Sequence, residues 1–218
     1  MILNLIWDVD GALCDTYPAV INACSRALKD FNRAAPMDRI SRLARVSREH
    51  CLHSLAQENG LAEDTLAERF DSDYARIGLE YQKPFAGVRE ICAYIQNRGG
   101  VNVLATQRTL DSTRRLLEVH DLSGWFVDIA AAQYNAADQP DVQRIAVLLQ
   151  RNRLEPAQTL AIGARAAFAA GAQAAGVRAC LFRAPRRDFQ ADLLVTDYTR
   201  LMRLIKQENG TIEEANQL

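Results

Sequence analysis

Short apolar runs along the chain predict buried strands. They span 2–7, 101–105, 159–162, 177–182 and 193–196, and each stops abruptly beside polar or small residues. Such runs, without alternation of polar and apolar residues, are typical of strands buried on both faces. Between them, apolar residues recur at intervals of three and four, as in 88–95 and 145–149, which predicts helices. Strands that alternate with helices indicate an α/β fold with a parallel sheet.

The stretch 18–82 has a different pattern. It contains helical stripes, such as 20–31 and 61–70, and no convincing strand. Because it interrupts the chain between the first two predicted strands, we expect an inserted all-helical cap at 18–82. The remaining parts, 1–17 and 83–218, then form a Rossmann-like α/β core. Ligands of open α/β sheets bind at the carboxyl ends of the strands, where this insert begins, so it is placed to act as a lid.

Two further segments have a biased composition. The alanine-rich run 161–175 is interpreted as a tightly packed helix rather than a linker. The tail 207–218 is polar and is expected to fray, as unanchored chain ends do.

Charge argues against a general polyanion binder. The 218 residues include 26 basic and 27 acidic side chains, a net charge of -1, whereas binding to nucleic acid needs a basic surplus. Arg39, Arg42, Arg45 and Arg48 recur every three residues and form one basic stripe. A solvated helix face is favoured for this stripe over a surface that recruits an anionic ligand or nucleic acid.

Cysteine usage and hydropathy indicate a cytoplasmic protein. The five cysteines include no CxxC pair, which gives no zinc pattern and fits reduced thiols. No apolar run approaches the ~18 residues of a membrane-spanning helix, and residues 1–7 are too short and uncharged for a signal peptide. We therefore expect no membrane association.

The candidate chemistry begins directly after the first predicted strand, in DVDG at 8–11. Two carboxylates two residues apart point the same way in an extended backbone. Asp8 is a candidate nucleophile and Asp10 a candidate acid and base, while Gly11 permits the turn that follows. An ordinary strand-to-loop turn is an equally good explanation of these residues alone.

Residues 8–16, DVDGALCDT, resemble the first motif of the haloacid dehalogenase superfamily, in its phosphoglycolate phosphatase and β-phosphoglucomutase branch. The likeness continues in KPFAGV at 83–88, in VLAT at 103–106 and from 154 to 176. The resemblance implies an α/β core with a helical cap and an aspartyl-phosphate formed at Asp8. It also implies that Asp10 transfers protons and that Thr106 orients the phosphoryl group.

Two motifs of that family are altered here. The third carries a lysine shortly before a Pro-Asp pair, and alignment on 140–141 places Ala137 at the lysine position. The fourth follows its glycine with an acid that binds magnesium, but Gly163 is followed by Ala164, and Phe168 stands where the family often has another acid. Asp8 and Asp10 remain as metal-ligand candidates. Magnesium is usually held by about six oxygen atoms, of which one or two protein carboxylates supply part. Because the acids of the fourth motif are missing, magnesium binding is expected to be weak or absent.

Two arginines are candidate replacements for the missing cations. Arg165 lies at a predicted helix N-terminus, which already favours anions, and Arg108 lies two residues after Thr106. With Gly11 they form the predicted substrate-binding set, Arg165 being the better placed. On sequence alone, a solvated loop position for Arg165 is nevertheless favoured.

Two functions therefore remain open. The first is a hydrolase of small phosphomonoesters, slowed because each missing cation removes about 4 kcal/mol, or roughly a thousandfold in rate. The second is a catalytically lapsed member of the same superfamily that binds a ligand or a protein partner.

Overall fold

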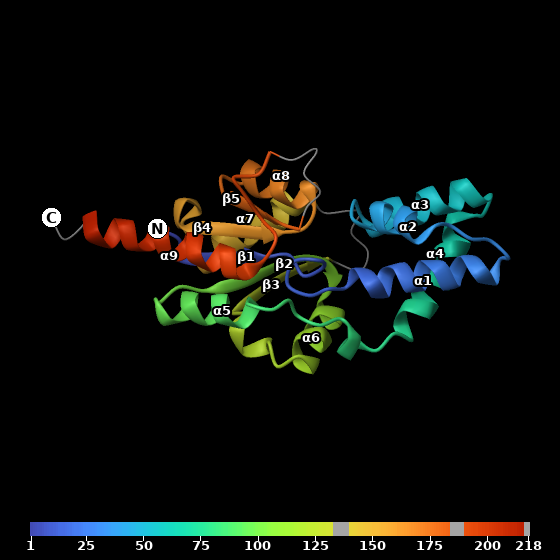
Figure 1. Ribbon diagram of the computed structural model, residues 1–218, viewed down its shortest axis with the longest axis horizontal. Coiled ribbons are helices and arrows are strands. Elements are labelled where there is room, and N and C mark those ends of the chain that lie inside the picture. The colour runs from blue at the N-terminus through green and yellow to red at the C-terminus, as the bar shows by residue number, and fades with distance from the viewer. Residues whose placement is uncertain (133–139, 184–189, 216–218) are drawn as a thin grey trace. The chain divides into compact units, whose positions relative to one another are not determined.

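A computed structural model describes residues 1–132, 140–183 and 190–215 of the chain (Figure 1). The chain divides into two compact units. Met1–Cys14 and Pro84–Leu218 form one, called here the α/β unit, and Asp15–Lys83 form the other, called the helical unit. The division expected from the sequence, 1–17 with 83–218 and 18–82, differs from these limits by one to three residues.

The α/β unit is built on a parallel sheet, as the sequence predicts. Its described strands are β1 (Asn4–Trp7), β2 (Asn102–Thr109), β3 (Asp128–Ala132), β4 (Thr159–Gly163), β5 (Arg178–Phe182) and β6 (Leu193–Val195). They pair in the order β3-β2-β1-β4-β5-β6, and every pair is parallel. The chain order reverses beside β1, between β2 and β4. In open α/β sheets such a switch point is where ligands bind.

Helices cover both faces of this sheet. They are α5 (Val88–Asn97), α6 (Leu110–Val119), α7 (Asp141–Asn152), α8 (Ala166–Ala174) and α9 (Tyr198–Ala215), with short 3-10 turns at Ser123–Trp125 and Pro156–Gln158. Successive side chains of a strand point to opposite faces. Ile6 of β1 accordingly packs in the cluster with α7 and α8, while its neighbour Trp7 meets the ring of Tyr198 in α9, with centroids 5.5 Å apart.

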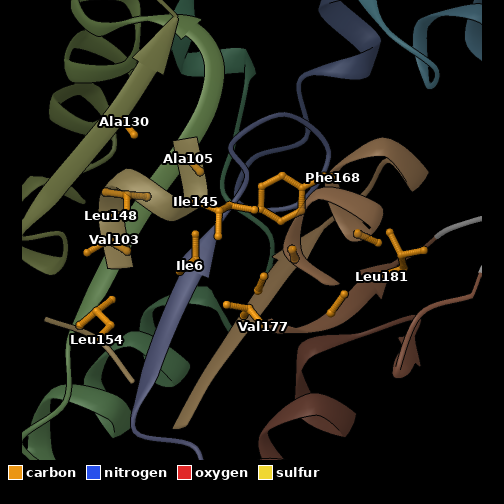
Figure 2. Close-up of a cluster of buried hydrophobic side chains, with 14 residues drawn as sticks. Ile6, Val103, Ala105, Ala130, Ile145, Leu148, Leu154, Phe168, Val177 and Leu181 are labelled. Atoms are coloured by element: carbon orange, nitrogen blue, oxygen red, sulfur yellow. The ribbon is translucent and has the colours of Figure 1, made fainter. Parts of the chain in front are cut away.

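The core between the sheet and α7 and α8 is shown in Figure 2. Ile6, Ile145 and Phe168 come from β1, α7 and α8, and their side chains lie next to one another without exposure to solvent. The small residues Ala169 and Ala172 of α8 belong to the same cluster, so the backbone of α8 approaches the sheet closely. This packing fixes the N-termini of α7 and α8 at the carboxyl edge of β1 and β4.

The helical unit contains α1 (Tyr17–Asp30), α2 (Met37–Ala44), α3 (Arg48–Asn59), α4 (Glu63–Ala75) and a 3-10 turn at Leu79–Tyr81. Helix α1 packs against α2 and α4, and α3 packs against the same two helices. Leu28, Leu55, Leu66 and Phe70 are buried in its interior.

The predicted basic stripe is largely neutralised within this helical unit. Three of its arginines form ion pairs: Arg39 with Glu58, Arg42 with Asp38 and Arg48 with Asp71. The fourth, Arg45, lies over the ring of Tyr17, 4.6 Å from its centroid. The stripe therefore presents much less positive charge than its sequence spacing suggests.

Two sequence expectations about regular structure were wrong. The alanine-rich run 161–175 is not one helix, because Ala161–Gly163 complete β4 and α8 begins only at Ala166. The tail does not fray from residue 207, because α9 continues to Ala215. Asn209 is fully buried there, accepting a hydrogen bond from Ile2 N (2.7 Å) and donating one to Ile2 O (2.9 Å). None of the helices in the described ranges is long and apolar enough to cross a membrane.

Candidate active site

Asp8 lies at the carboxyl end of β1, at the switch point of the sheet. Its backbone N–H donates to Ile162 O at 2.8 Å, which extends the pairing of β1 with β4 by one residue. Asp8 is only 1% exposed, and its Oδ1 accepts a hydrogen bond of 2.9 Å from Val9 N. The side chain is thus held by the sheet and by the first peptide of the following loop.

The loop after Asp8 turns tightly back on itself. Leu13 N and Cys14 N donate to Asp8 O and Val9 O, and Gly11 N donates to Cys14 O. Gly11 has φ 74°, a left-handed conformation that glycine adopts without the steric penalty of other residues. The turn leaves the side chain of Asp10 about one-third exposed, at 30%.

Arg165 pairs directly with Asp8. Its Nε and Nη2 lie 3.2 Å and 3.1 Å from Asp8 Oδ2, and Nη2 also lies 3.1 Å from Oδ2 of Asp141. Arg165 precedes the first residue of α8 and is 5% exposed. The solvated loop position favoured from the sequence is therefore wrong. A guanidinium is retained inside the unit because two buried carboxylates need a counter-charge.

Asp141 reaches this site because α7 and α8 approach closely. A Cβ added to Gly171 in α8 would lie 2.8 Å from Val142 N and 3.0 Å from Asp141 Cβ. Glycine at 171 therefore permits the backbone contact that places the N-terminus of α7 beside Arg165. Arg144, one turn along α7, donates to the Asp141 carboxylate at 3.0 Å and is itself 2% exposed.

A second group joins Thr106, Arg108 and Asp10. Strand β2 continues beyond Thr106 to Thr109, with an irregular register after Ala105, so Thr106 lies within the strand and is fully buried. Its Oγ1 accepts a hydrogen bond of 3.1 Å from Arg108 N. The guanidinium of Arg108 donates from Nη1 to Asp10 Oδ1 at 2.9 Å. The first and second motifs are thus connected through Arg108.

Burial dominates the electrostatics of Asp8. Loss of hydration raises the pKa of Asp8 from 3.8 to about 7, against the lowering effect of Arg165 and with smaller increases from Asp10 and Asp141. The folded protein therefore favours the protonated form of Asp8 more than water does, although the positive charge of Arg165 opposes this effect.

The residues around Asp8 do not fit the magnesium ion that the family resemblance implies. In the described ranges no three acids, histidines or cysteines are grouped so that they could hold a metal. Asp8 and Asp141 both contact Arg165, and the residue after Gly163 is the buried Ala164, which has no side-chain oxygen. Ala137, at the expected lysine position, lies outside the described residues.

Phe168 belongs to the core rather than to the site. A Cβ added to Gly163 would lie 2.3 Å from Phe168 Cδ1, so the ring covers the backbone of Gly163. Phe168 is fully buried in the cluster of Figure 2. The position of the family's second acid has therefore become part of the hydrophobic packing.

Sequence reasoning did not identify Arg144 as part of this site. Its signal was weak: an acid and an arginine three residues apart at the start of a predicted helix also describe an ordinary exposed ion pair. What distinguishes Asp141 and Arg144 is burial, which follows from the close contact at Gly171.

Comparisons with known proteins agree with this architecture. The sequence model of haloacid dehalogenase-like hydrolases matches residues 5–182. Phosphoglycolate phosphatase from Caulobacter vibrioides is 27% identical over 207 residues, which cover 89% of this chain and 87% of that protein. The phosphoglycolate phosphatase from Vibrio parahaemolyticus is 23% identical over 168 residues, 73% of this chain and 74% of that one.

Solved structures share the fold. A candidate β-phosphoglucomutase from Thermotoga maritima superposes with a TM-score of 0.75 at 20% identity, covering 95% of this chain and 99% of that one. A haloacid dehalogenase-like family hydrolase from Streptococcus pneumoniae gives 0.77 at 17% identity, covering 94% and 98%. The chain therefore belongs to the haloacid dehalogenase-like hydrolase family, in the branch that resembles phosphoglycolate phosphatases and β-phosphoglucomutases.

Proposed function

We propose that this protein hydrolyses small phosphomonoesters at the carboxyl edge of β1 and β2, with Asp8 as nucleophile. The observation that carries the proposal is that each carboxylate of the DVDG loop contacts a different arginine. Asp8 is paired with Arg165 and Asp10 with Arg108. The two arginines are our candidates to supply the positive charge that the altered third and fourth motifs lack.

The chemistry proceeds in two balanced steps. Asp8 Oδ1 forms a bond to phosphorus as the ester oxygen leaves and takes a proton from Asp10. A water molecule, deprotonated by Asp10, then attacks the same phosphorus, which releases inorganic phosphate and restores the Asp8 carboxylate. Thr106 and Arg108 orient the phosphoryl group, and Gly11 lets the loop backbone approach it.

Asp8 retains an oxygen for this attack. Both contacts from Arg165 go to Oδ2, while Oδ1 accepts one hydrogen bond from Val9 N. Because a carboxylate oxygen has two lone pairs, Oδ1 keeps one for phosphorus. The attraction of opposite unit charges at 3.1 Å is about 5 kcal/mol at an effective dielectric of ~20. This attraction is similar in size to the stabilisation of about 4 kcal/mol that each missing cation would have provided.

A second candidate is a ligand-binding protein without turnover. The ion pair between Arg165 and Asp8 favours this candidate, because it stabilises Asp8 before any reaction occurs. Arg165 also shares its positive charge with Asp141, which leaves less of that charge for a transition state. In such a protein a phosphorylated ligand or a protein partner would bind at the same edge without forming an aspartyl-phosphate.

A hydrolysis assay separates the two candidates. Phosphoglycolate, the substrate named for two relatives, and p-nitrophenyl phosphate are offered to the wild type, to Asp8→Asn and to Asp111→Asn, which alters an exposed acid of α6. The proposal predicts turnover by the wild type and by Asp111→Asn at least 100-fold above Asp8→Asn. Equal rates in all three proteins, with phosphate raising the melting temperature of the wild type, would establish the second candidate.

A further inference from the structure

One nitrogen of Arg165 is shared by two carboxylates. Nη2 lies 3.1 Å from Asp8 Oδ2 and 3.1 Å from Asp141 Oδ2, so these two oxygens are no more than about 6 Å apart with the nitrogen between them. Two carboxylates from different elements that share one cation resemble the carboxylate ligands of a divalent metal, which would lie closer to them, at about 2.0–2.6 Å. Here the cation is part of the chain.

We propose that the Arg165 guanidinium is a built-in cation that occupies the divalent-metal position beside Asp8, and that it excludes metal from the folded protein. The exclusion is a property of the folded site and does not depend on turnover. Only its catalytic consequence, hydrolysis without metal, rests on the proposed function.

The charge balance of the site supports exclusion. Among the residues that the structure describes, Asp8 and Asp141 are matched by Arg165 and Arg144, and each of the four is at most 6% exposed. The neighbouring pair of Asp10 and Arg108 adds no net charge. A divalent ion would bring two uncompensated positive charges into a place that contains little water to solvate them, which is strongly unfavourable.

The position of Arg165 is fixed by packed elements rather than by a loose side chain. It directly precedes α8, whose Phe168 and Ala169 are buried against the sheet. Asp141 is held against α8 by the contact at Gly171, and Arg144 donates to its carboxylate from the same helix. The guanidinium therefore needs little reorganisation to stabilise charge at Asp8.

Removal of Arg165 should convert the site into a metal site. In Arg165→Ala two buried carboxylates face a space without a counter-charge, and binding of a divalent ion would relieve their repulsion. Mn²⁺ is a suitable probe, because its free form gives an electron paramagnetic resonance signal that is lost on binding. Arg114→Ala is the matched control, since it removes an exposed arginine from α6.

The test is a Mn²⁺ titration of the purified full chain. At about 1 mM Mn²⁺ we expect no Asp8-dependent binding by the wild type or by Arg114→Ala, so the Kd of either protein for Mn²⁺ at this site should exceed about 1 mM. Arg165→Ala should bind at least tenfold more tightly than the wild type, and Arg165→Ala/Asp141→Asn should lose the gain. If Arg165→Ala does not fold, Arg165→Gln replaces it with the same expectation.

Two results would overturn the inference. One is Mn²⁺ binding by the wild type that disappears in Asp8→Asn, and the other is a folded Arg165 variant that gains no binding. Neither readout involves turnover. A wild type that excludes Mn²⁺ but hydrolyses no phosphomonoester would refute the proposed function alone, whereas hydrolysis that depends on magnesium would refute the inference alone.

Discussion

Asp8→Asn should change the pH dependence of stability as well as activity. The pKa of Asp8 is raised from 3.8 to about 7 in the folded protein, chiefly by burial. Between these values the folded chain binds one proton more than the unfolded chain, so the free energy of unfolding falls as pH rises and becomes constant above about pH 7. The asparagine side chain of the variant does not titrate, so this decline is absent from Asp8→Asn.

The size of the effect follows from the shift. A change of one pKa unit corresponds to about 1.36 kcal/mol, so the rise from 3.8 to about 7 amounts to about 4 kcal/mol over the whole window. Between about pH 4.5 and pH 8 the stability of the wild type relative to Asp8→Asn should therefore decline by about 3 kcal/mol. Titration of all other groups is common to both proteins and largely cancels in this difference.

Urea unfolding at several pH values measures the difference. The buried Trp7 supplies a fluorescence signal from the residue before Asp8, and Asp111→Asn, which alters an exposed acid, serves as the control whose curve should remain parallel to that of the wild type. Parallel curves for the wild type and Asp8→Asn would show that Asp8 titrates in the folded protein as it does in the unfolded chain. A relative stability that increases with pH would refute the dominance of burial over the ion pair with Arg165.

Three further outcomes test other parts of the structure. The acidic limb of the kcat/KM profile for a phosphomonoester should have its midpoint at about pH 7, because the nucleophile Asp8 must be ionised; a rate that is already maximal at about pH 5 would contradict this. Phe168→Asp should lower the free energy of unfolding in urea by at least ~3 kcal/mol because the ring is fully buried, whereas Ala167→Asp, exposed in the first turn of α8, should have little effect; equal losses would contradict the core position of Phe168. Gly171→Ala should cost about 1–3 kcal/mol in the same assay, since its Cβ would lie 2.8 Å from Val142 N, and unchanged stability would show that α7 and α8 separate easily.

The strands of the sheet were predictable wherever their apolar runs are long and bulky. Strand β3, DIAAA, was missed because three of its five residues are alanine and it lies at the edge of the sheet, where only part of its surface is buried. Helix α9 was missed for a related reason. Its polar end is anchored by Asn209 to Ile2, a contact between residues 207 positions apart that local pattern cannot reveal.

The α/β pattern predicted the strands beside Asp8 and Thr106, but not the contacts around Asp8. Asp8 and Thr106 follow apolar runs that pair in the sheet, so their approach follows from the α/β pattern. The burial of Arg165 does not, because it depends on the carboxylate of Asp141 and on the helix contact at Gly171. Its position in the sequence favoured a solvated loop for Arg165, whereas the ion pairs with Asp8 and Asp141 hold its side chain in the interior of the α/β unit.

Hydrolysis of phosphoglycolate by metal-free protein tests the replacement of metal by arginine most directly. The wild type and Asp8→Asn are dialysed against excess EDTA, and their rates are compared with and without added magnesium. Turnover by the chelated wild type that exceeds Asp8→Asn and is unchanged by magnesium is the predicted result. Turnover that appears only when magnesium is added, or a chelated wild type no faster than Asp8→Asn, would contradict it.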